Sequence, residues 1–79
     1  MKTAIPTIVN KQIELWVLDA PSGETYDVVH LKLSNTWTIE EGVYNESADD
    51  WDFETIYHGP DFSPVSKLMH RCGVMQLVS

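Results

Sequence analysis

The sequence predicts an α+β domain, a small twisted antiparallel sheet of about three to five strands with one short helix packed on one face. Three observations support this class. Apolar residues recur at every second position early in the chain, and a helical apolar stripe with matched ends occupies about 64–72. The length of 79 residues suits a single compact domain, residues 1–79, built around one core.

The N-terminal half predicts a meander of strands. Residues 1–10 are sparsely apolar, so we expect a loose or edge-pairing start. Residues 11–19 alternate with the period of two that a strand requires, although both sides of this strand are rich in apolar residues. Turn-forming residues at 20–24 separate it from a second strand at 25–33. A short third strand is expected at 36–39.

The C-terminal part contains the predicted helix. Ser63 is placed to be its N-cap, Pro64 suits the first helical position, and Gly73 suits the left-handed residue that follows a helix. The apolar positions that fall on one helical face are Val65, Leu68, Met69 and Cys72. The apolar run at 74–78 predicts a final strand inserted against the sheet.

Charge is segregated along the chain. Twelve acids and five bases give a formal charge of −7, and no Lys or Arg lies between Lys32 and Lys67. The acids of this interval are Glu40, Glu41, Glu46, Asp49, Asp50, Asp52, Glu54 and Asp61. A direct nucleic-acid binder needs clustered bases to displace counterions from phosphates, so direct DNA or RNA binding is disfavoured.

Two patterns compete at 48–58. Ser47 and Asp50 have the spacing of a capping box, which favours a helix at this point. Aromatic and β-branched residues that alternate with carboxylates favour a strand instead, and the strand is the preferred interpretation. The aromatic side of this alternation comprises Trp51, Phe53, Thr55 and Tyr57. On a strand, Asp50, Asp52 and Glu54 share one face, with carboxylates repeating every ~6.7 Å.

This carboxylate repeat suggests a function. A nucleic-acid strand presents one phosphate per ~3.4 Å of axial rise, and its winding makes the through-space separation longer and comparable to the carboxylate repeat. We therefore expect a phosphate-mimicking surface that docks on a basic nucleic-acid-binding protein or complex. The solvated face of an ordinary acidic protein is the alternative. The candidate partner-binding residues are Glu40, Glu41, Tyr44, Asp49, Asp50, Trp51, Asp52 and Glu54. For the two aromatic residues among them, core packing is the alternative to exposure at an interface.

Other chemistry finds no support in the sequence. No nucleophile stands with a base, so no enzyme is expected. A calcium loop beginning at Asp50 would have Thr55 in place of the required glycine, and His70 and Cys72 point apart on a helix, so we expect no metal and no cofactor. The single cysteine cannot form an internal disulfide. With no signal peptide and no long apolar run, this predicts a cytoplasmic protein without a membrane span.

In size, charge and lack of a catalytic motif, the chain resembles the small phage-encoded antagonists of bacterial defence, the anti-CRISPR and anti-restriction proteins. Several of these imitate nucleic acid. The resemblance is one of properties and transfers no site residue. It implies a non-enzymatic inhibitor that occludes a nucleic-acid-binding surface. The alternative is a structural or assembly module that forms a homodimer through an exposed strand edge or through the doubly apolar strand at 13–18.

Overall fold

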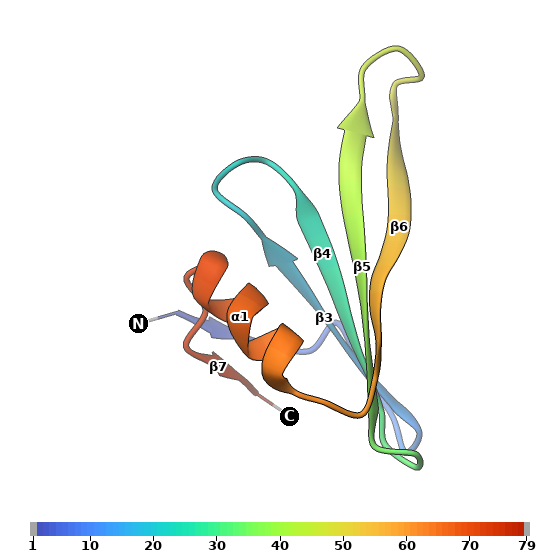
Figure 1. Ribbon diagram of the computed structural model, residues 1–79, viewed down its shortest axis with the longest axis vertical. Coiled ribbons are helices and arrows are strands. Elements are labelled where there is room, and N and C mark those ends of the chain that lie inside the picture. The colour runs from blue at the N-terminus through green and yellow to red at the C-terminus, as the bar shows by residue number, and fades with distance from the viewer. Residues whose placement is uncertain (1, 79) are drawn as a thin grey trace.

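The computed structural model describes residues 2–78 and confirms the predicted α+β class (Figure 1). A five-stranded antiparallel sheet has the order β2-β3-β4-β5-β6, and a separate two-stranded parallel sheet joins β1 to β7. The strands of the main sheet are β2 (Ile8–Val9), β3 (Ile13–Asp19), β4 (Thr25–Leu31), β5 (Thr36–Asn45) and β6 (Asp50–Gly59). The remaining elements are β1 (Thr3–Ala4), α1 (Ser63–Arg71) and β7 (Gln76–Leu77).

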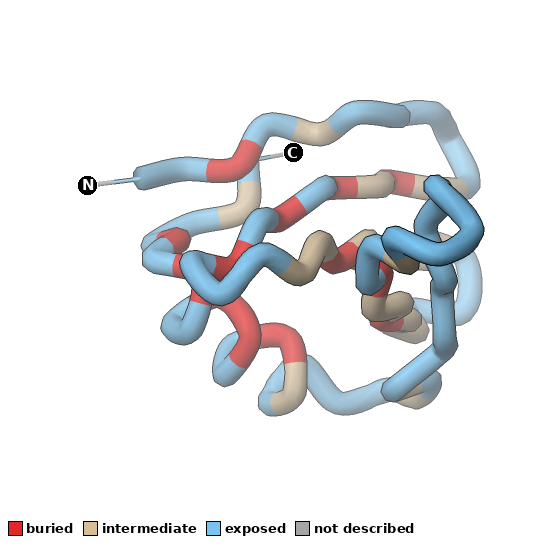
Figure 2. Tube along the Cα trace, turned by 90° about the horizontal axis from the view of Figure 1, so that it is seen from above, coloured by how far each residue is buried: buried red, intermediate tan, exposed pale blue. Residues whose placement is uncertain are grey.

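The core lies between one face of the main sheet and the helix. Trp16, Val28 and Ile39 stand beside one another on β3, β4 and β5, and all three are almost fully buried. Val65 and Leu68 of α1 complete this core from the other side. In Figure 2 most of the buried stretches lie in the strands and in the helix, and Ala20, Cys72 and Val74 are buried just outside these elements. Because the opposite face of the sheet has no helix over it, the fold has a one-sided core.

The helix begins one residue earlier than the sequence predicts. Ser63 is its first residue and not the N-cap; Phe62 precedes it in the α region and makes no side-chain capping bond. Its C-terminal end follows the prediction, because Gly73 takes a φ of 71° and its N–H donates to the His70 carbonyl at 3.2 Å. Within residues 2–78, no helix has the length and apolar character needed to cross a bilayer.

The chain's last strand corrects a second expectation. β7 does not join the main sheet; it pairs in parallel with β1. The edge beside β3 is already taken by β2, which confirms the edge-pairing start. The C-terminal segment is fixed instead by two bonds at Val78: its N–H donates to the Ala4 carbonyl and its carbonyl accepts from the Trp16 indole, each at 2.9 Å.

A β-bulge divides the hairpin of β5 and β6. Ile39 pairs with Tyr57, whereas the next residue, Glu40, pairs with Thr55, so Ile56 is an extra residue on β6. The alternation in the sequence places Tyr57 on the same side as Trp51, and this is wrong. The bulge brings Tyr57 to the helix side, where it packs against the core, and leaves the aromatic residues before it on the other face.

Replacing Gly73 with Ala tests the helix end. A left-handed backbone costs a residue with a Cβ about 1–2 kcal/mol, and nothing lies close enough to the added atom to cause a clash. We therefore expect Gly73→Ala to lower the free energy of unfolding by about 1 kcal/mol in urea titrations. Gly73→Asn is the control, with a smaller loss expected because Asn tolerates this conformation. An unchanged midpoint for the alanine variant would contradict the assignment.

Candidate functional site

The hairpin of β5 and β6 projects beyond the helix (Figure 1). Its two strands have ten residues each, which corresponds to about 33 Å, whereas the nine residues of α1 span only about 14 Å. The distal part of the hairpin therefore has no helix over it. We call residues 40–55 the hairpin tip; seven of the eight acids of the acidic interval lie within it, and Glu54 is the last of them along β6.

Four carboxylates lie on the helix-side face of the hairpin tip. The strand interpretation of this segment is right, and Asp50, Asp52 and Glu54 alternate along β6 on one face. Glu41 stands directly opposite Glu54 on β5. Asp52 also accepts a hydrogen bond from the Asn45 side chain at 3.2 Å. We call Glu41, Asp50, Asp52 and Glu54 the acidic face.

The other predicted residues lie elsewhere on the tip. Glu40, Tyr44 and Trp51 are on the opposite face, where the two aromatic rings meet edge to face at 5.6 Å between centroids. Both rings are about 40% exposed, so they are not core residues. Asp49 occupies the turn with a φ of 51° and accepts a hydrogen bond from Tyr44 Oη, which raises the pKa of that phenol. The structure therefore distributes the eight predicted residues over two faces and a turn.

One member of the acidic face is tied to the core. The hydroxyl of Tyr26 donates to Glu41 Oε2 at 2.7 Å, and Tyr26 itself is fully buried. Burial, followed by the bond to Glu41, raises the pKa of Tyr26 to about 12. Arg71 of α1 lies over the same ring, 5.6 Å from its centroid, and pairs with Glu24 at 3.3 Å. These contacts fix the base of the acidic face to the helix.

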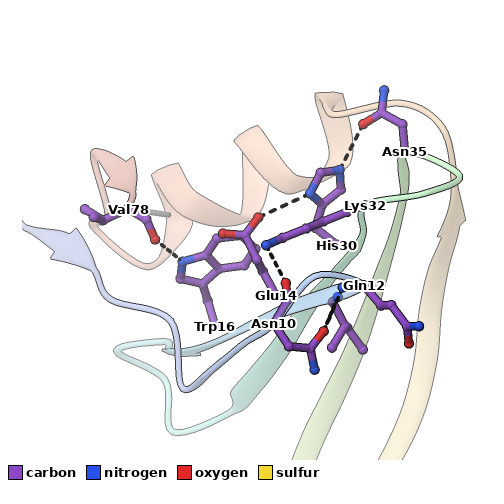
Figure 3. Close-up of polar contacts among 9 residues, drawn as sticks. Asn10, Gln12, Glu14, Trp16, His30, Lys32, Asn35 and Val78 are labelled. Atoms are coloured by element: carbon purple, nitrogen blue, oxygen red, sulfur yellow. Dashed lines mark hydrogen bonds and ion pairs between the residues drawn. The ribbon is translucent and has the colours of Figure 1, made fainter.

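The sequence patterns did not predict the buried carboxylate of Glu14. The Glu14 side chain is only 6% exposed, its Oε1 lies 3.5 Å from His30 Nδ1, and its Oε2 has no hydrogen-bond partner within residues 2–78 (Figure 3). A signal was present, because Glu14 shares its side of the strand with Trp16 and Leu18. That side is the core side, whereas the strand's other side faces away from the helix.

Metal and thiol chemistry gain no support from the geometry. In the described part of the chain, no three His, Cys, Asp or Glu side chains are grouped so as to hold a metal ion. Cys72 is a buried free thiol on the apolar side of the helix end, and burial raises its pKa. A raised pKa disfavours the reactive thiolate.

Comparison of the chain with family models, curated proteins and solved structures finds no match.

Replacing Tyr26 with Phe tests the tie between the acidic face and the core. The change removes one hydrogen bond to a carboxylate, so we expect a loss of about 1.5 kcal/mol in the free energy of unfolding. Tyr44→Phe is the matched control, because it removes the same type of bond at an exposed site and should cost much less. Equal losses of unfolding free energy for both variants in urea titrations would show that the bond between Tyr26 and Glu41 adds no more stability than an exposed one.

Asp27→Asn tests a pH effect. Asp27 stands opposite Glu40 on the sheet, and burial raises its pKa. Because the pKa of Asp27 is higher in the folded protein than in the unfolded chain, the folded protein favours the protonated carboxyl. The contribution of Asp27 to the free energy of unfolding is therefore fully present below its ordinary pKa near 3.8, and it is lost as the pH rises through the pKa of the folded state. We expect the Asn variant to melt at a higher temperature than the native chain at pH 7 and at a similar one at about pH 3. Asp19→Asn, at the end of β3, controls for the removal of one charge. A higher stability of the native chain at pH 7 would refute the sign.

Proposed function

We propose that this chain is a non-enzymatic, cytoplasmic inhibitor that occludes a basic nucleic-acid-binding surface of another protein or complex by presenting the hairpin tip in place of phosphates. The observation that supports it best is the acidic face itself. Asp50, Asp52 and Glu54 follow one another along an exposed strand, and the adjoining sequence from 33 to 66 contains no Lys or Arg to neutralise them. Side chains two apart on a strand repeat every ~6.7 Å.

The shape of the tip favours a cleft as the complementary surface. Carboxylates occupy both faces, with the acidic face on one side and Glu40 on the other. A flat partner would meet only one of these faces, whereas a groove that normally encloses a nucleic-acid strand would contact both. The field of the tip would steer the approach and add to the association rate, and salt would screen it.

The aromatic pair would supply the apolar part of the contact. Tyr44 and Trp51 lie together on the face opposite to the acidic face, and both expose area that nothing in residues 2–78 covers. Aromatic side chains are the residues that most often dominate binding energy at protein interfaces. Docking would therefore combine charge on one face with burial of these rings on the other.

The proposed role agrees with the resemblance in properties to anti-CRISPR and anti-restriction proteins. It needs no catalytic group, cofactor or metal on this chain. Inhibition would follow from occupancy alone, since a partner whose basic groove holds the hairpin tip is closed to DNA or RNA.

An assembly module remains the second candidate, because β6 is an edge strand with one side unpaired within the described residues. A second copy adding its own β6 there would extend the sheet. The carboxylates of two such strands would then be brought together, and charges on an edge strand oppose this kind of pairing. The doubly apolar strand at 13–18 pairs with β4 along its whole length, whereas β2 pairs only with Glu14 and Leu15, and Val17 on its outer face is 43% exposed.

The decisive variant replaces three carboxylates of the acidic face, as Asp50→Asn, Asp52→Asn and Glu54→Gln together. Immobilised chain would be incubated with nuclease-treated bacterial lysate at low and high salt, and captured proteins identified by mass spectrometry. We expect the native chain to capture a nucleic-acid-handling complex at low salt. The triple variant should bind the same complex with an affinity at least about tenfold lower. The captured complex should also lose DNA or RNA binding when the native chain is added.

A matched triple variant, Asp19→Asn, Asp27→Asn and Asp61→Asn, removes the same charge from outside the hairpin tip. It should retain most of the binding, because net charge then changes equally while the repeat along β6 is kept. An equal loss of binding affinity in both triple variants would show that binding depends on net charge alone, and this would contradict phosphate mimicry. Recovery of only a second copy of the chain, with a salt-resistant dimer mass in sedimentation, would favour the assembly module.

A further inference from the structure

A cavity of about 420 Å³ lies between the helix side of the main sheet and the segments of α1 and β7 that face it. Its volume falls within the about 300–1,000 Å³ of typical small-molecule sites. Its inner end is formed by Glu14 and Trp16, which are buried, and its outer end by Phe62 and Met75, which are exposed. The cavity is therefore open to solvent at one end and polar at the other.

The polar group at the inner end is an incompletely bonded carboxylate. Glu14 is only 5% exposed, and its Oε2 accepts no hydrogen bond within residues 2–78. The contact of Oε1 with His30 Nδ1, at 3.5 Å, is longer than the usual 2.7–3.2 Å of a hydrogen bond. Figure 3 shows the carboxylate lying between the Trp16 indole and the His30 ring. A buried acceptor without a donor is costly, and a bound donor would remove that cost.

Part of the cavity wall is formed by stacked rings, and Met69, Met75, Gln76 and Leu77 form much of the rest. Three rings contact the indole of Trp37. The His30 ring stacks on it at 4.1 Å between centroids, and the Trp16 ring stacks on it at 6.0 Å. The Phe62 ring meets it edge to face at 4.9 Å. Faces of indole rings attract cations, and the attraction grows when the cation is desolvated. The carboxylate and the rings thus favour the same class of ligand.

We propose that this cavity binds a small organic cation that carries N–H groups, an alkylammonium or guanidinium, with the Glu14 carboxylate accepting its hydrogen bond and the aromatic rings of the cavity lying beside its charge. An anion would meet the Glu14 carboxylate at the inner end. A quaternary ammonium has no N–H for Oε2. The site is distinct from the acidic face, which lies on the projecting hairpin away from α1 and β7 (Figure 1).

The test titrates the full chain with n-butylammonium or butylguanidinium chloride at constant ionic strength, following the indole N–H signals of Trp16 and Trp37 by NMR. For ligands of this size we expect dissociation constants of about 1–10 mM. Two control ligands should each bind with an affinity at least about fivefold lower than that of butylammonium. They are tetramethylammonium, which lacks an N–H group, and 1-butanol, which donates a hydrogen bond but carries no charge. A blocked Gly-Lys-Gly peptide separates the two sources of such a group: tighter binding than butylammonium indicates a protein side chain, weaker binding a free amine, and either supports the cation site.

Glu14→Gln should weaken cation binding about tenfold, because the amide keeps the shape and loses the charge. The acidic-face triple variant is the matched control and should leave this affinity unchanged, so failure here is separable from failure of the hairpin. If Glu14→Gln does not fold, Phe62→Ala at the outer end is the second variant, with a several-fold loss expected. Unmoved indole signals, equal binding of 1-butanol or tetramethylammonium, or full affinity in the folded Glu14→Gln chain would overturn the assignment.

Discussion

A nine-residue helix is the only helix packed on the five-stranded sheet within residues 2–78, and this constraint governs the rest of the structure. Such a helix covers about 14 Å, so it buries the row of Trp16, Val28 and Ile39 and leaves the distal part of the longer hairpin of β5 and β6 without a covering layer. Side chains on the uncovered part meet water on both faces. Carboxylates can therefore gather there without the desolvation penalty that they would meet over the core.

The boundary between the covered and uncovered parts is built from a few polar contacts. Tyr26 lies in the core and donates to Glu41, the first carboxylate of the acidic face, while Arg71 of the helix lies over the same ring. The bulge at Ile56 stands at the same level of the hairpin, and beyond it the strands no longer contribute to the core. Core packing thus ends where the acidic face begins, and the tip is held as a projection of a fixed base.

The hairpin and the cavity share one electrostatic preference in two different environments. On the hairpin the carboxylates are solvated, numerous and spaced along a strand, which suits an extended basic surface and a salt-dependent approach. In the cavity a single carboxylate, Glu14, is desolvated and surrounded by aromatic rings, which suits one compact cation. The net charge of −7 counts the solvated and the buried carboxylates alike, so it shows neither the clustering on the hairpin nor the burial of Glu14.

Local patterns in the sequence determined the meander, the helix with its glycine end and the strand character of the acidic segment, because period and turn chemistry act over a few residues. Long-range packing decided what those patterns cannot specify. The bulge at Ile56 moved Tyr57 to the core side and set the acids on the helix side, and pairing with β1 took β7 out of the main sheet. Burial of Glu14 was decided in the same way: alternation divides a strand into two sides, but which side receives the helix depends on where distant segments pack.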